Sequence, residues 1–192
     1  MKWSKKTNIL VAVLEIEGPE LIRIKNGKDA GKDVSILKMV VGEPSIGSDG
    51  GNNTSAPFCR LTAWRETADT WAGEDTSRGA NVAVKKGDVV YIESTFLVRL
   101  KGDYLIKLIV YNIDVLFSAS PQTADTTGIQ QNAIYTLTAS PWLDSRILIC
   151  YRILPTDRTD RALCPDLRLG ASDAAVRRVD NVVRWLKAVL GV

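Results

Sequence analysis

Hydrophobic and polar positions along the first part of the chain follow the short periods of β-strands. Residues 8–17 form an apolar run rich in branched side chains, which favours a buried strand at this length. Gly18-Pro19 is expected to end it. Residues 21–25 then alternate apolar with basic side chains, and turn-forming residues lead into another apolar run at 34–41. The chain is therefore predicted to begin with a meander of three strands.

Residues 58–64 alternate more strictly than any of these. The alternation gives one face of small apolar side chains, Cys59, Leu61 and Ala63, and one face of Phe58, Arg60, Thr62 and Trp64. The small apolar face suits a core, which leaves the aromatic and basic face exposed, as in a platform on which nucleobases stack. The inverse assignment, with Phe58 and Trp64 in the core, fits the pattern equally well.

A short helix is predicted over 66–72, with Trp71 as a plug under the sheet, and two long strands follow at 89–100 and 104–116 around a tight hairpin loop. Five strands with a small helix between the third and fourth are typical of the OB-fold. This mainly β fold is a partly open Greek-key barrel that binds oligonucleotides across one face. We therefore expect an OB-fold domain over residues 1–116.

Two segments of this domain resemble the bacterial single-stranded-DNA-binding proteins. They are residues 58–69 and residues 84–93, and the resemblance extends over about residues 8–116. It implies that Phe58 and Trp64 stack on bases, that the turn-rich loop 42–57 grips DNA, and that the protein self-associates as a dimer or tetramer through its barrels.

The chain departs from this family at three places. Lys101 stands where the family has another stacking tryptophan, and the loop 42–57 contains no aromatic residue. The family's glycine-rich linker and acidic tip are also missing, so we expect no recruitment of repair enzymes by that route.

The leading hypothesis is a non-enzymatic, largely sequence-independent binder of single-stranded DNA in replication, recombination or repair. Phe58 and Trp64 would stack on bases, and basic side chains would lie near phosphates: Arg60, Arg23, Lys38, Arg99 and Lys101. The alternative is an OB-fold interaction or oligomerisation module, such as a replication accessory or scaffold, with weak or no DNA binding.

The rest of the chain divides into a linker-like segment, 117–141, and a C-terminal extension, 142–192, with a helix at 173–190 capped by Ser172. One apolar stripe follows the helix: Val176, Val179, Val183, Leu186 and Leu190. The stripe could be an oligomer or partner contact, and the helix could instead be a phosphate clamp or a membrane-surface helix. The plainest alternative is that it packs on its own domain with solvated charges outside.

The charge and the residue composition exclude several classes of function. The formal net charge is +3, and residues 140–192 hold nine Lys or Arg and six Asp or Glu, so the first 139 residues sum to zero. The sequence has no histidine and three cysteines without C-x-x-C spacing, which argues against most hydrolytic triads, a metal site, a cofactor or a disulfide framework. The apolar run at 9–14 is broken by Glu15 and has no small-residue cleavage site after it, so it is neither a signal peptide nor a membrane span, and the cysteine pattern indicates a reducing compartment. We therefore expect a cytoplasmic protein, nucleoid-associated if bacterial.

Overall fold

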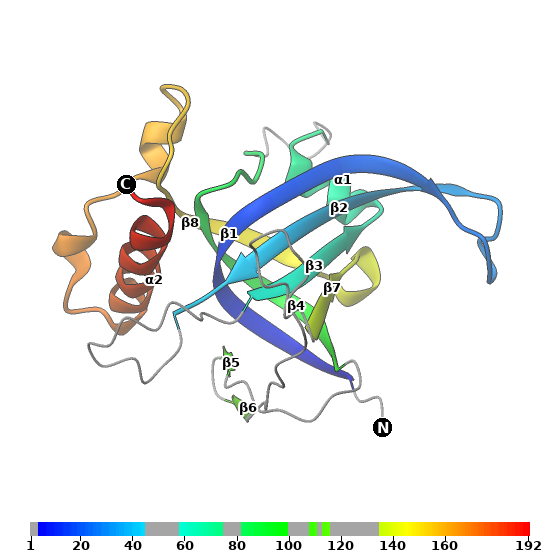
Figure 1. Cartoon of the computed structure of the whole chain (residues 1–192), viewed down its shortest axis with the longest axis horizontal. Coiled ribbons are helices and arrows are strands. Elements are labelled where there is room, and N and C mark those ends of the chain that lie inside the picture. Colours follow the sequence, from blue (N-terminus) through cyan, green and yellow to red (C-terminus); the bar gives the residue numbers. More distant parts are fainter. Residues whose placement is uncertain (1–3, 45–57, 75–81, 100–107, 111–112, 116–134) are drawn as a thin grey trace, which may run out of the picture.

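The protein is described by a computed structural model for residues 4–44, 58–74, 82–99, 108–110, 113–115 and 135–192 (Figure 1). Its strands are β1 (Ser4–Arg23), β2 (Asp33–Gly42), β3 (Phe58–Trp64), β4 (Asp88–Arg99), β5 (Leu108–Val110), β6 (Ile113–Val115), β7 (Tyr135–Ala139) and β8 (Arg146–Arg152). Its helices are α1 (Glu66–Ala72) and α2 (Ala174–Leu190), with 3-10 turns η1 (Pro141–Leu143), η2 (Asp160–Leu163) and η3 (Leu167–Gly170). The fold is mainly β with a C-terminal helix, as expected.

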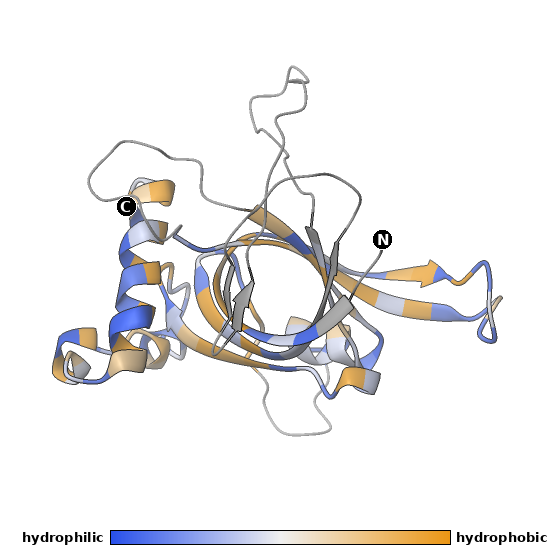
Figure 2. Ribbon diagram, turned by 90° about the horizontal axis from the view of Figure 1, so that it is seen from below, coloured by the Kyte–Doolittle hydropathy of each residue, from blue (hydrophilic) through white to orange (hydrophobic). Residues whose placement is uncertain are grey.

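Six of the strands form one mixed sheet in the order β1-β2-β3-β7-β4-β8. All pairings are antiparallel except that of β3 with β7. Strand β1 has two partners, because its first part pairs with β4 and its later part with β2. Figure 2 shows the strands curving and the β1–β2 ribbon extending away from the rest of the sheet.

Strand β1 continues through the position at which the sequence predicted a break. The expected strands 8–17 and 21–25 are one element of 20 residues. The register slips between Glu17 and Glu20, so Gly18 and Pro19 form a bulge instead of a turn. A bulge tolerates a proline, which has no N–H to give to the ladder. Gly18 has φ +100°, and a Cβ there would lie 2.9 Å from the Ile36 carbonyl oxygen, which explains the glycine.

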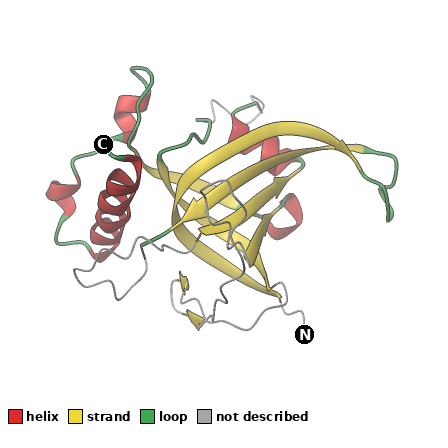
Figure 3. Ribbon diagram, viewed as in Figure 1, coloured by secondary structure: helices red, strands yellow, loops and turns green. Residues whose placement is uncertain are grey.

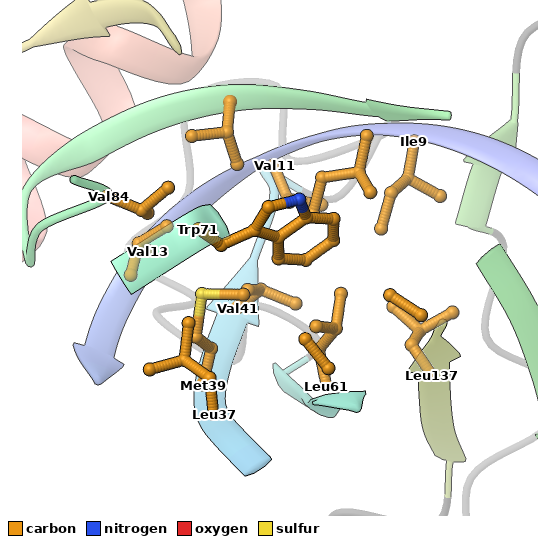
Figure 4. Packing of buried hydrophobic residues seen from close by; sticks show 14 of the residues in the cluster. Ile9, Val11, Val13, Leu37, Met39, Val41, Leu61, Trp71, Val84 and Leu137 are labelled. Carbon is orange, nitrogen blue, oxygen red and sulfur yellow. The ribbon is translucent and has the colours of Figure 1, made fainter. Parts of the chain in front are cut away.

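The core lies between the inner face of the sheet and α1. Helix α1 forms at the predicted residues, and Trp71 on it is 2% exposed, which confirms its expected place as a plug (Figure 4). Apolar side chains from β1, β2, β3 and β7 surround it, among them Val11, Leu61 and Leu137. A buried aromatic side chain of this size contributes several kilocalories per mole of hydrophobic stabilisation.

The strand that pairs with the end of β4 is not the one that the sequence predicted. Residues 104–116 were expected to return beside β4, but their described parts, β5 and β6, pair with each other. The end of β4 pairs antiparallel with β1 on one edge and with β7 on the other, and β7 comes from within the segment predicted to be linker-like. Strand β7 is only five residues long, and its buried Leu137 and Ala139 alternate with threonines, so the signal is short and weak. With β7 and β8 in it, the sheet extends beyond the expected boundary at residue 116.

Helix α2 packs against the outer side of the sheet, as Figures 1 and 3 show. Val182, Val183 and Leu186 are buried with Ala12 of β1 and Val89 of β4. Of the predicted stripe, Val183 and Leu186 are buried, and Val176, Val179 and Leu190 are partly buried. The stripe therefore contacts the chain's own domain, as the plainest of the alternatives expected, and an oligomer or partner contact for it stays a prediction.

The ends of α2 follow ordinary capping rules, with one correction. Asp173, not the expected Ser172, is the N-cap, and its carboxylate accepts hydrogen bonds from the backbone N–H groups of Ala175 and Val176. Gly191 ends the helix in the left-handed conformation, as predicted. Within the described residues, no helix is long and apolar enough to cross a membrane.

Candidate nucleic-acid interface

The outer side of β3 carries the residues that the sequence singled out. Cys59, Leu61 and Ala63 are buried at 6%, 0% and 0% exposure, whereas Arg60 on the opposite face is exposed. Phe58, Thr62 and Trp64 are half-buried on that same outer face. The predicted assignment of the two faces is confirmed, and the inverse assignment is wrong.

Neighbouring strands add to this surface in a fixed register. Strand β2 places Lys38 opposite Thr62 and Val40 opposite Arg60, and β7 places Thr136 opposite Arg60 and Thr138 opposite Thr62. Directly opposed residues lie on the same side of a sheet. We call the resulting surface the β3 face; it consists of Lys38, Val40, Phe58, Arg60, Thr62, Trp64, Thr136 and Thr138.

Trp64 has an apolar residue directly opposite it in the sheet. Ile36 is directly opposite Trp64 on β2 and is only 4% exposed. Partners in register have Cβ atoms about 5 Å apart, so the two side chains are neighbours on this side of the sheet. A half-buried aromatic ring beside an apolar side chain is a suitable surface for stacking a planar base.

The positive charge of Lys38 is already partly compensated. Its ammonium group forms an ion pair with the Glu20 carboxylate, and the two side chains are 48% and 51% exposed. The hydrogen bond from Lys38 to Glu20 raises the pKa of the lysine, so it stays charged at neutral pH. A phosphate group near Lys38 would have to compete with Glu20.

At the other end of β3, Phe58 lies beside a tryptophan that the sequence reasoning missed. Phe58 is in register with Gly42, and a Cβ on Gly42 would lie 3.0 Å from Phe58 Cδ1 and 3.0 Å from Trp185 Cη2. The missing side chain at Gly42 therefore makes room for both rings. Trp185 comes from α2, and a helix far along the chain carries no local signal that it reaches β3.

The remaining predicted residues are dispersed. Arg23 is exposed at the end of β1, opposite Asp33 and away from Trp64 along the ribbon. Arg99 ends β4 with its backbone opposite Tyr135, but its side chain, Lys101 and loop residues 45–57 lie outside the described residues. The structure thus brings Phe58, Arg60, Trp64 and Lys38 onto one surface and leaves Arg23 apart.

A buried ionic cluster, also missed from the sequence, fixes the C-terminal segment to β4. Arg152 is 0% exposed; its Nε and Nη2 donate to the two carboxylate oxygens of Asp88 at 2.7 Å each, and Nη1 donates to Asp160. Nη2 also donates to the Ala83 carbonyl at 2.6 Å. Such a cluster is tolerated only when its hydrogen bonds are made, and here the two carboxylates share one guanidinium.

Asp160 is held by further donors. The backbone N–H and the hydroxyl of Thr156 donate to it at 2.8 Å each, and the Lys85 ammonium lies 3.0 Å away. These hydrogen bonds, with the backbone N–H of Thr156 first, hold the pKa of Asp160 well below its usual range. Because the cluster is buried and internally paired, its evident role is structural.

The buried thiol of Cys59 is unsuited to act as a nucleophile. Burial raises the pKa of Cys59 to about 12, so its thiol is protonated and a poor nucleophile at neutral pH. Across the described ranges, no group of three or more metal-ligating side chains is close enough to hold a metal ion.

No protein-family model matches this sequence, and no curated protein matches it significantly. Function is therefore inferred from the strand arrangement and from the chemistry of the β3 face.

Proposed function

We propose that the protein is an OB-fold protein that binds single-stranded DNA on the β3 face without catalysing a reaction. The fold part of the proposal is supported by the strand pairings, which lead from β1 through β2, β3, β7 and β4 back to β1. Helix α1 lies between β3 and β4 in the chain. This order supports a five-stranded Greek-key OB barrel in which β7 would be the fifth strand, and the β2–β3 surface of that fold is its usual oligonucleotide site.

The observation that carries the functional part is the pairing of aromatic rings with an exposed arginine on the outer side of β3. Phe58 and Trp64 are six positions apart, which in a strand corresponds to roughly 20 Å, enough for several nucleotides between them. Arg60 is exposed on the same side between the two rings. Bases would stack on the rings while Arg60 neutralises a phosphate.

Stacking would dominate the affinity on this surface. Each stacked base contributes about 1–3 kcal/mol and every base has a flat face, so binding would tolerate many sequences. Two phosphate contacts, from Arg60 and Lys38, would give a logarithmic salt slope of only about −1.4 on a single strand. Duplex DNA would bind worse because its paired bases are stacked on one another.

Fluorescence anisotropy with labelled oligo-dT at low salt tests this proposal. We expect Trp64→Ala to weaken binding roughly 5- to 150-fold, which corresponds to one lost stacking contact. Trp142→Ala is the matched control, since Trp142 is 82% exposed, comes from η1 and is not one of the residues of the β3 face, and it should bind as the wild type does. Equal affinity of Trp64→Ala and the wild type would contradict the proposal.

A protein-interaction or oligomerisation module is the second candidate. It is favoured by the ion pair that compensates Lys38 and by the packing of Trp185 near Phe58, both of which limit access of DNA to the β3 face. Light scattering combined with a DNA gel shift separates the two candidates. A defined dimer or tetramer that fails to retain DNA would support the second one.

A further inference from the structure

A cleft of about 1120 Å³ lies between α1, η1 and β8. Trp71 of α1 and Ile149 of β8 both line it, and both also pack in or against the core. Around it lie three apolar side chains with large exposed fractions, Trp142 at 82%, Leu148 at 62% and Val82 at 51%. Such a concentration of exposed apolar surface is typical of an interaction site.

The cleft follows the free edge of β8. Four consecutive residues of this strand, 146–149, line it. Successive side chains of a strand point to opposite faces, so a space that all four touch must run along the strand's edge. Within the described part of the sheet, β8 pairs with β4 and is the last strand in the order. Its other edge therefore presents backbone donors and acceptors to the cleft.

The charged side chains at the cleft are mostly compensated within the protein. The Arg146 guanidinium lies 3.0 Å from the Asp144 carboxylate, and the Arg65 guanidinium lies 2.5 Å from Asp29. Glu66, also at the cleft, adds negative charge. The cleft therefore has no surplus of positive charge with which to bind a phosphate chain. An uncharged apolar segment does not need such a charge and suits the apolar side chains of the cleft.

We propose that this cleft binds an extended, uncharged segment of a partner protein, which adds to β8 as a further strand. Alternate side chains of the segment would point toward Trp71 and Ile149, and the others would lie beside Leu148. Backbone hydrogen bonds to β8 give affinity in this mode of recognition, and the pockets for alternate side chains give specificity. The site is separate from the β3 face and does not depend on DNA binding.

The test uses the full chain and a defined probe, the acetylated and amidated peptide Thr-Val-Thr-Val-Thr-Val-Thr with a fluorescent label, measured by anisotropy. Saturable binding is expected. Leu148→Asp should weaken it about tenfold or more, because a charge would face the added strand. Leu169→Asp is the matched control, since Leu169 is 88% exposed and outside the cleft, and it should bind the peptide normally.

Two N-methylated peptides test the strand geometry itself. Every second residue of an added strand directs its N–H toward β8, so methylation of one alternate set should abolish binding and methylation of the other should leave it intact. Absence of binding, equal binding of the two methylated peptides, or an unchanged Leu148→Asp variant would overturn the proposal.

Two further outcomes would also overturn it by naming another occupant. If light scattering shows that the free protein is a dimer and that Leu148→Asp dissociates it, the occupant of the cleft is a second copy of the chain. Displacement of the peptide by oligo-dT from both the wild type and Trp64→Ala would show a nucleic acid in the cleft. Failure of the peptide to bind would leave the oligo-dT affinity, and hence the proposed function, untouched.

Discussion

Replacement of Arg152 by alanine is predicted to be a severe change for the stability of the fold. The guanidinium makes two hydrogen bonds to Asp88, one to Asp160 and one to the Ala83 carbonyl, and no part of its side chain reaches solvent. Without it, two carboxylates that are 0% and 1% exposed lose their shared counter-charge.

Removal of one partner from a buried ion pair costs about 3–5 kcal/mol, because the remaining charge stays buried. For a chain of this length each kilocalorie per mole shifts the melting temperature by about 2–4 °C, so Arg152→Ala should melt roughly 6–20 °C lower. Differential scanning calorimetry at neutral pH measures the shift. The matched control is Arg168→Ala. The Arg168 side chain is 91% exposed and forms an ion pair with Asp166, so its loss should change the melting temperature little.

The same variant has a predicted pH signature. The folded-state pKa of Asp160 is lowered, so its contribution to stability is present above the unfolded value of about 3.9 and is lost as the pH falls through the folded pKa. Arg152 supports this shift, and the loss of stability on acidification should therefore be shallower in Arg152→Ala. A melting temperature within about 2 °C of the wild type at neutral pH would refute the structural role of the cluster.

Three further predictions concern single side chains. Glu20→Gln removes the carboxylate that competes with a phosphate for Lys38, so oligo-dT should bind more tightly at low salt; an unchanged affinity in anisotropy titrations would exclude Lys38 from the phosphate contacts. Trp71→Ala should lower the free energy of unfolding in urea by about 3–5 kcal/mol, because Trp71 is buried in the core, and a loss below about 1 kcal/mol would contradict its place there. Burial raises the pKa of Cys59 to about 12, so its thiol should resist alkylation by iodoacetamide at pH about 8 until the protein unfolds. Alkylated Cys59 in the folded protein, found by mass spectrometry, would contradict this prediction.

Local patterns in the sequence identified the elements that govern the candidate site. The alternation in β3 placed Phe58, Arg60 and Trp64 on the outer face, and the helix after it was predicted at its observed residues. A two-residue period specifies which side chains share a face, and burial of the small apolar set then decides which face is inside. This information is contained within seven residues.

The errors concern relations between distant segments. Gly18 and Pro19 predicted the end of a strand. The sheet accommodates them in a bulge, because β1 is paired with neighbouring strands both before and after these two residues. The stripe on α2 showed which face is apolar, but its period cannot show what covers that face. Arg152 lies in a segment with many charges, and its partner Asp88 is 64 positions away, so nothing nearby marked it as buried.

Photo-crosslinking to an oligonucleotide that contains 5-iodouracil tests the central claim most directly. Stacked aromatic side chains react with this base on irradiation, and peptide mass spectrometry locates the bond. We expect crosslinks at Trp64 or Phe58 with single-stranded DNA, strongly reduced when the same oligonucleotide is in a duplex. Crosslinks confined to other regions, such as Trp142 in the cleft beside β8, or none at a concentration that saturates binding, would contradict DNA binding on the β3 face.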